Sequence, residues 1–198
     1  MSKRKATKSR KTGETSINLE LALDGDTQYE NSTGVGFFDH MLDLFARHGR
    51  FGLTVSADGD TETGAHHTVE DVGIVLGQAL DEALGDRAGI RRYGSALVPM
   101  DEALAECAID ISGRPHLVFR ADLPKASIAG FETELAEEFF GAVANSAKLT
   151  LHISIPYGTN VHHMIEAAFK AFARALRVAV SIDPEETGVP STKGTLNE

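Results

Sequence analysis

Two kinds of hydrophobic periodicity run along this chain of 198 residues. In TSINLELAL, residues 15–23, every second side chain is apolar, which predicts a half-buried strand. In residues 66–84 apolar side chains recur at helical spacing and Gly85 follows, which predicts an amphipathic helix that ends there. Both periods occur in each half of the chain, so strands and helices alternate along it.

Two more elements are predicted in the first half. FFDHMLDLFARHG, residues 37–49, has the spacing of a helix, with Asp39 as its N-cap and Gly49 as its end. FGLTVSA, residues 51–57, is predicted to be a strand. The segment before the helix, residues 24–36, is rich in turn-forming residues.

The second half repeats this order. The predicted elements are strands at 103–111 and 115–121, a helix at 134–147, a strand at 149–155 and a long helix at 160–180 capped by Asn160. When Val55 is aligned on Ile153, His40 falls on Glu138. With a loop two residues shorter, HHTVE falls on HHMIE. The pattern indicates duplication of one strand–helix–strand–helix unit.

The duplication suggests a division of the chain into four parts. Residues 1–11, MSKRKATKSRK, are expected to be a disordered basic tail. Residues 12–94 form the first half and residues 95–182 the second. The aperiodic residues 183–198 form an irregular C-terminal arm.

Composition excludes several classes of protein. The net charge of −10 argues against a nucleic-acid binder, which needs a basic face. No apolar run approaches the roughly 20 residues of a membrane span, and the N-terminus lacks the apolar stretch of a secretion signal. The single Cys107 lies in an apolar segment and is expected to be a buried thiol, which fits a cytoplasmic protein.

The motif HHxxE occurs twice, in AHHTVED (65–71) and VHHMIEA (161–167), and uses four of the eight histidines. On a helix the first histidine and the glutamate share a face, whereas the second histidine points about 100° away, toward a different ion or subunit. Imidazole and carboxylate ligands suit Mn, Fe, Co, Ni or Zn. A single copy is typical of a solvated helix start, but two copies in register predict two metal sites. The expected ligands are His66, His67, Glu70, His162, His163 and Glu166.

The duplication adds further candidates. His40 begins the helix before the first HHxxE and is a candidate ligand, and so is its counterpart Glu138. His48, at the end of that helix, is interpreted as a helix-terminal charge or a neighbour of the substrate. His116 and His152 lie in predicted strands and are expected to be structural.

These residues resemble one enzyme family along nearly the whole chain. GFFDHMLDLFARHGRF, HHTVEDVGIVLGQAL, PMDEALAE, DISGRP, HHMIEAAFKAFARALR and GVPSTKG are similar to the signature segments of the imidazoleglycerol-phosphate dehydratases of histidine biosynthesis. The resemblance implies an α/β (α+β, two-layer) fold of two halves like domain 2 of ribosomal protein S5, each a four-stranded sheet with two helices on one face. It also implies two Mn(II) ions per subunit and a 24-subunit shell built from trimers, with active sites shared between subunits.

The resemblance also implies a ligand set, with two departures. The implied metal ligands are His40, His66, His67, Glu70, Glu138, His162, His163 and Glu166. The segment EEFF places Glu138 where relatives often have histidine. Gly64 and Ala65 stand where DDHHTVED is common, so a carboxylate that orients the histidines is expected to be missing.

The reaction implied is dehydration of D-erythro-imidazole-glycerol phosphate to imidazole-acetol phosphate. A metal on the ring nitrogen stabilises an imidazolate that expels the hydroxyl. Glu14 is the candidate for proton transfer, with Asp101 and His48 as helpers. The implied substrate contacts are Glu14, His40, His66, Arg92, Arg114, His162, Lys170, Ser191, Thr192 and Lys193.

Two alternatives stay open on the sequence. A metal-storing shell would have similar histidine-rich sites, although it would not need phosphate-binding residues such as Arg92, Arg114 and Lys193. A two-metal hydrolase would use HHxxE to activate water, although the spacing differs from the zinc-protease motif HExxH.

Overall fold

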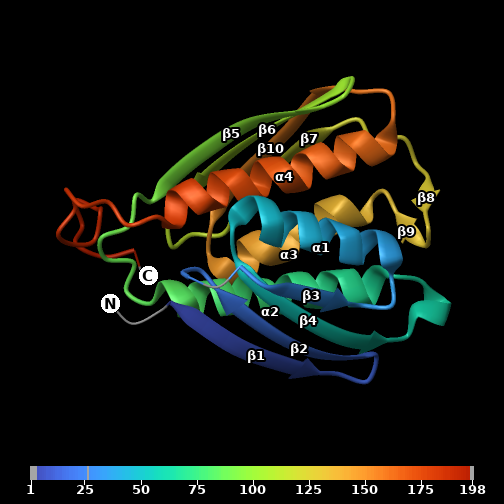
Figure 1. Ribbon diagram of the computed structural model, residues 1–198, viewed down its shortest axis with the longest axis horizontal. Coiled ribbons are helices and arrows are strands. Elements are labelled where there is room, and N and C mark those ends of the chain that lie inside the picture. The colour runs from blue at the N-terminus through green and yellow to red at the C-terminus, as the bar shows by residue number, and fades with distance from the viewer. Residues whose placement is uncertain (1–3, 26, 197–198) are drawn as a thin grey trace.

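The computed structural model describes residues 4–25 and 27–196, and it consists of two outer sheets with four helices between them (Figure 1). The first half comprises β1 (Lys5–Lys11), β2 (Thr15–Ala22), β3 (Tyr29–Ser32), α1 (Gly36–Gly49), β4 (Gly52–Gly59), the 3₁₀ turn η1 (Thr61–Thr63) and α2 (His66–Leu84). The second comprises β5 (Tyr93–Met100), β6 (Ala103–Asp110), β7 (His116–Ala121), β8 (Ser127–Ile128), β9 (Phe131–Glu132), α3 (Leu135–Ala147), β10 (Thr150–Tyr157) and α4 (Val161–Val180).

The predicted duplication is confirmed by the sheet topology. The strand orders are β1–β2–β4–β3 and β5–β6–β10–β7. In each four-stranded sheet the last strand along the chain, β4 or β10, runs parallel to the edge strand β3 or β7, and the other pairings are antiparallel. The hairpins also match in register, because Lys5 pairs with Ala22 as Tyr93 pairs with Asp110.

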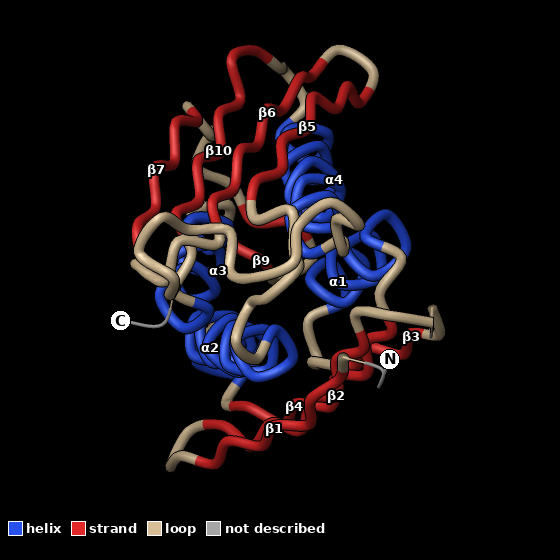
Figure 2. The backbone as a smooth tube through the Cα atoms, turned by 90° about the vertical axis from the view of Figure 1, so that its left-hand side faces the viewer, coloured by secondary structure: helices blue, strands red, loops and turns tan. Residues whose placement is uncertain are grey.

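The helices of the two halves form a common core. α1 packs on α4 and α2 on α3, with one sheet covering each side of this helical layer (Figure 2). Phenylalanine pairs join the halves: the rings of Phe45 and Phe172 are stacked with their centroids 5.5 Å apart, and those of Phe38 and Phe139 meet edge-on at 5.4 Å. Each helix therefore buries its apolar stripe against a helix of the other half.

The expected tail at residues 1–11 is wrong for its described part, because residues 5–11 form β1. Two of the cations of β1 pair with acids of the first half: Arg10 Nε lies 2.8 Å from Asp71, and Lys8 pairs with Glu82. Several lysines are also typical of an edge strand, where they discourage pairing with other chains. Residues 1–3 lie outside the described part of the chain.

Several predicted boundaries are confirmed and one cap is wrong. Residues 66–84 form α2 and Gly85, with φ of 57°, ends it. Asn160 caps α4 by accepting a hydrogen bond from His162 N at 3.0 Å. Asp39, in contrast, does not cap α1: it lies within the helix and accepts hydrogen bonds from the backbone and hydroxyl of Thr33.

Two other features concern the core and the surface. Cys107 is buried as expected, and burial raises the pKa of its thiol. Among the helices of residues 4–25 and 27–196, none combines the length and apolar character that crossing a membrane requires.

Candidate metal and phosphate sites

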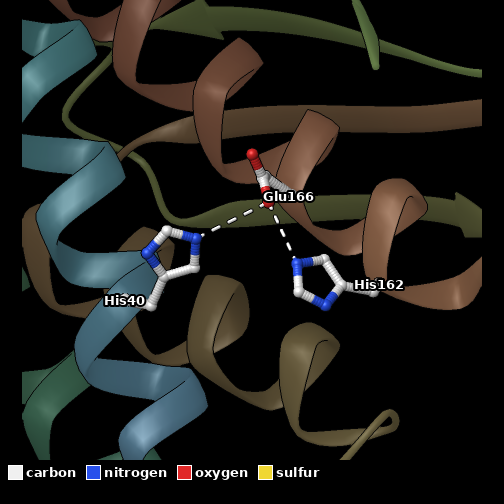
Figure 3. A group of neighbouring side chains, drawn as sticks. All are labelled: His40, His162 and Glu166. Carbon is white, nitrogen blue, oxygen red and sulfur yellow. Dashed lines mark hydrogen bonds and ion pairs between the residues drawn. The ribbon is translucent and has the colours of Figure 1, made fainter. Parts of the chain in front are cut away.

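A cluster of metal-ligand type joins the two halves of the chain where α1 packs on α4. His40, from α1, points toward His162 and Glu166, from the first two turns of α4 (Figure 3). Glu166 Oε2 lies 3.6 Å from His40 Nε2 and 3.1 Å from His162 Nε2. One ligand atom from each of the three residues lies within 4.8 Å of the others. Two imidazole nitrogens and a carboxylate fit a transition-metal ion.

The glutamate of this cluster is kept ionised by its neighbours. Its side chain is 8% exposed, and burial by itself would raise its pKa. Hydrogen bonds from Lys170 and His162 outweigh the effect of burial, so the pKa of Glu166 is lowered. Lys170 Nζ lies 2.5 Å from Glu166 Oε1. Lys170 was expected to contact the substrate phosphate, but in the single chain its positive charge offsets the negative charge of the Glu166 carboxylate.

The first HHxxE motif forms an incomplete counterpart. His66 Nε2 lies 3.9 Å from Glu70 Oε2 on α2, as the helical spacing predicts. Glu138, on α3, is exposed. Within residues 4–25 and 27–196, His40, His162 and Glu166 are the one group of three or more whose ligand atoms converge, so Glu138 does not complete a site with His66 and Glu70 in one chain.

The second histidine of each motif points elsewhere, toward a hairpin turn. His67 Nδ1 lies 3.1 Å from Asp60 Oδ2, and its Nε2 lies 3.8 Å from Glu14. The hydrogen bond with Asp60 raises the pKa of His67. Asp60 therefore provides a carboxylate beside the histidine pair, although Gly64 and Ala65 replace the expected acids.

His163 has a matching environment in the second half. Its Nδ1 lies 2.8 Å from Glu102 Oε2, and its Nε2 lies 3.8 Å from Asp101. The hydrogen bond with Glu102 raises the pKa of His163. Sequence analysis missed Glu102 and Asp60; the one signal for Glu102 was its place in the duplicated hairpin, equivalent to that of Glu14.

A second site gathers most of the expected phosphate contacts at the other end of the molecule. A cavity of about 670 Å³ is lined by Arg92, Arg114, Ser191, Thr192 and Lys193, among others. Arg92 is held by Asp110 at 2.7 and 3.1 Å and by the carbonyl of Pro190. Its pKa is raised, chiefly by the hydrogen bond with Asp110. Guanidinium groups, a lysine and two hydroxyls suit a phosphate.

The C-terminal arm, residues 183–196 in the structure, is fixed over this cavity by an arginine that sequence analysis missed. Arg87 is fully buried, donates to the carbonyl of Leu196 and lies 2.5 Å from Asp81. Gly113 allows the arm to approach, because a Cβ there would lie 1.9 Å from the oxygen of Leu196. The arm is therefore packed on the second half, and residues 197–198 lie outside the described part.

His48 lies apart from both sites among arginines. Arg47 and His48 are in the last turn of α1 and Arg177 in that of α4, where the helix dipole favours cations. Together with Arg50 and Arg174 they line one cavity. Burial, followed by the charges of Lys170 and Arg174, lowers the pKa of His48. His48 therefore lines a different cavity from the expected phosphate contacts, and it does not belong to the cluster of His40, His162 and Glu166.

Comparisons with known proteins agree on one family. Residues 33–176 match the family described as imidazoleglycerol-phosphate dehydratase. Curated dehydratases of this name from Halalkalibacterium halodurans and Geobacter metallireducens are 59% and 60% identical over 193 residues, covering 98% of this chain and 100% and 99% of theirs.

Solved structures of such dehydratases are also similar. That from Staphylococcus aureus subsp. aureus N315 is 45% identical with a TM-score of 0.82, over 90% of this chain and 99% of the other. That from Pyrococcus furiosus, in complex with (S)-C348, is 38% identical with a TM-score of 0.83, over 96% of this chain and 100% of the other.

Proposed function

The chain belongs to the imidazoleglycerol-phosphate dehydratase family, and from this we propose that it converts D-erythro-imidazole-glycerol phosphate to imidazole-acetol phosphate. It is an enzyme of the hydro-lyase class that acts in histidine biosynthesis. The proposal extends to the metal, to the residues that carry the reaction and to a cytoplasmic location.

The convergence of His40, His162 and Glu166 is the observation that carries the proposal. These donors fit Mn(II), and the equivalent motif His66–Glu70 supports a second ion per subunit. When bound, Mn(II) supplies Lewis acidity toward the substrate's imidazole ring. His67, His163 and Glu138 are proposed to complete the ligand sets.

Glu14 is the proposed proton-transfer residue. It lies in the turn between β1 and β2, and its carboxylate is 56% exposed, 3.8 Å from His67 Nε2. The carboxylate can therefore face a substrate held at this end of the molecule. Asp101 lies at the same distance from His163 Nε2 in the equivalent turn and is a candidate helper, with His48 the other.

Arg114, Ser191, Thr192 and Lys193 are proposed to bind the substrate phosphate, with Arg92 positioned beside them. The groups supply positive charge and donors that match a phosphate dianion. Lys170 is proposed to bind the phosphate as well, once a metal ion takes its place beside the Glu166 carboxylate.

The two sites lie too far apart in one chain to bind one substrate. His162 is in the first turn of α4, whereas the carbonyl of Ala179, in the last turn, accepts a hydrogen bond from Arg92 N. At 1.5 Å per residue these positions are about 25 Å apart along the helix. A glycerol phosphate with one imidazole cannot span this distance. The separation supports active sites shared between subunits, in the proposed 24-subunit shell of trimers.

The test is to incubate the purified protein with Mn(II) and imidazole-glycerol phosphate and to identify products by NMR. The ketone is expected, and His40→Ala should lose it while His116→Ala, a change at an exposed strand histidine, should not. Metal retention without any product would favour a metal-storing shell. Release of inorganic phosphate instead of the ketone would favour a hydrolase.

A further inference from the structure

The carboxylate of Glu102 is held by an unusually complete set of donors. Its Oε1 accepts hydrogen bonds from the backbone of Thr159 at 3.0 Å and of Asn160 at 2.7 Å, and lies 3.3 Å from the Thr159 hydroxyl. Its other oxygen, Oε2, faces His163 Nδ1 at 2.8 Å. The backbone donors just before α4 therefore fix which oxygen meets the histidine.

In the first half Asp60 faces His67 in the same way, but fewer hydrogen-bond donors hold its carboxylate. Its two oxygens lie 3.2 and 3.1 Å from His67 Nδ1, and Oδ2 also accepts from the hydroxyl of Thr63 at 2.9 Å. Among the described residues, the one backbone N–H that bonds this carboxylate is that of Asp60 itself. This carboxylate can therefore rotate, whereas that of Glu102 cannot.

An ionised carboxylate can only accept, so the histidine must donate. Each imidazole consequently carries hydrogen on Nδ1, and the Nε2 of the neutral ring keeps its lone pair.

We propose that Asp60 and Glu102 are positioning residues that hold His67 and His163 in the Nδ1–H tautomer, with Nε2 presented to a metal ion. Hydrogen bonding of the other ring nitrogen is a general means of orienting a metal-binding histidine. The inference rests on the proposed metal function, and it concerns only how this chain prepares its ligands.

The duplication shows how the two halves divide this task. The matched hairpin registers make Glu14 and Glu102 equivalent residues. Glu102 occupies the Nδ1 side of its histidine, whereas Glu14 lies on the Nε2 side of His67, because Asp60 already holds Nδ1. Asp60 thus leaves the carboxylate of Glu14 available for proton transfer.

The test is the dissociation constant of Mn(II), measured without substrate on metal-free protein from the EPR signal of free Mn(II). In Glu102→Gln the amide oxygen stays with the backbone donors, so the NH₂ group must face His163 Nδ1. That forces hydrogen onto Nε2 and removes the lone pair. Binding to the affected site should weaken about 10–100-fold, the usual effect of losing such a partner.

Glu102→Ala separates tautomer control from a structural role. Alanine leaves either tautomer open, so Mn(II) should bind more tightly than to Glu102→Gln, although alanine removes more hydrogen bonds. A structural role predicts the reverse order. Unchanged binding by Glu102→Gln, or weaker binding by Glu102→Ala than by Glu102→Gln, would overturn the proposal. Glu20→Gln, at an exposed position of β2, is the charge-matched control and should bind normally.

Asp60 supplies an independent comparison. Asp60→Asn should bind Mn(II) nearly normally because its amide can rotate to offer oxygen, whereas Asp60→Ala should bind more weakly. Equal binding by these two variants and the unaltered protein would refute the role of Asp60. If the unaltered protein itself binds no Mn(II), the proposed function fails first; if it binds and these variants match it, only the positioning role fails.

Discussion

Single residues carry the proposed chemistry because each is placed by a rigid neighbour. Glu14 lies in the turn between β1 and β2, close to His67 at the start of α2. Lys193 lies in the C-terminal arm, which Arg87 holds in place. Neither depends on the hydrophobic core for its own position. Substitution of either should therefore change the kinetics of the enzyme with little loss of folding stability.

Glu14→Gln is expected to lower kcat by about 10²–10⁴-fold, the usual contribution of a positioned acid–base group. Glutamine keeps the shape but cannot exchange a proton, so metal content and assembly should persist. Steady-state kinetics together with metal analysis measure both. A near-normal kcat would move the proton transfer to another residue, with Asp101 examined next. Loss of metal or of the assembly would make Glu14 a structural residue.

Lys193→Ala is expected to raise KM at least tenfold, because a charge-assisted hydrogen bond contributes about 1.5–3 kcal/mol. Lys193 lines the cavity of Arg92 and Arg114, so Mn(II) binding at the distant histidines should be unchanged. Kinetics and a Mn(II) titration on one preparation test this. If KM and kcat both keep their normal values, Lys193 does not contact the substrate.

At the scale of elements, the helices were more predictable than the strands. α2 and α4 have long apolar stripes and clear ends, so periodicity located them closely. β1, β3 and β5 were missed: β1 is a lysine-rich edge strand, and β3 spans only Tyr29–Ser32 within a turn-rich segment. These three strands form because they pair with neighbouring strands, and such pairing is not encoded in the local sequence.

The same distinction applies to the candidate site. His66–Glu70 and His162–Glu166 follow from spacing on one helix, so the sequence predicted both contacts. The contacts of Asp60, Glu102 and Arg87 join a loop or turn to another element. Such contacts depend on tertiary packing, which the repeat pattern alone does not locate.

Close helix packing gives a prediction for Gly77 of α2. A Cβ at this position would lie 2.8 Å from Val143 O and 2.9 Å from Ala147 N, which are backbone atoms of α3 and cannot rotate away. Gly77→Ala should therefore lower the free energy of unfolding by about 1–3 kcal/mol through overpacking.

Gly141→Ala, on α3, is the matched control. Its Cβ would lie 3.7 Å from Leu117, an ordinary contact, so helix propensity should stabilise the protein by up to about 1 kcal/mol. Denaturation midpoints of the two variants are expected to move in opposite directions. A stabilised Gly77→Ala variant would contradict the close packing of α2 on α3.

At the scale of the whole molecule, the two candidate sites lie at opposite ends. The HHxxE motifs and hairpin turns lie at one end of the helical layer, and the C-terminal arm lies at the other (Figure 1). The proposed shared active site would require the arm end of one subunit to approach the histidine end of another. Substitutions at the histidine end should therefore affect metal binding, and substitutions at the arm end should affect binding of the substrate phosphate.

Arg87→Met is expected to release the arm, because methionine keeps the length but cannot donate to Leu196 or Asp81. Breaking a buried charge pair costs about 3–5 kcal/mol, so the arm should become accessible to proteases and KM should rise. Arg91→Met, at an exposed arginine 3.9 Å from Asp183, is the control. An arm as protease-resistant as in the unaltered protein would show that other contacts hold it.

Removal of metal is expected to dissociate the assembly and abolish activity together. Among the described residues of one chain, His66 and Glu70 have no third converging ligand, and the histidine and phosphate sites are about 25 Å apart along α4. Ligands from a neighbouring subunit would complete the first set, so metal binding would contribute free energy to association. Light scattering and activity, followed during chelation and after Mn(II) is restored, test the coupling. A metal-free particle of unchanged size would show that the subunits associate through protein contacts alone, and the metal would then serve only the reaction.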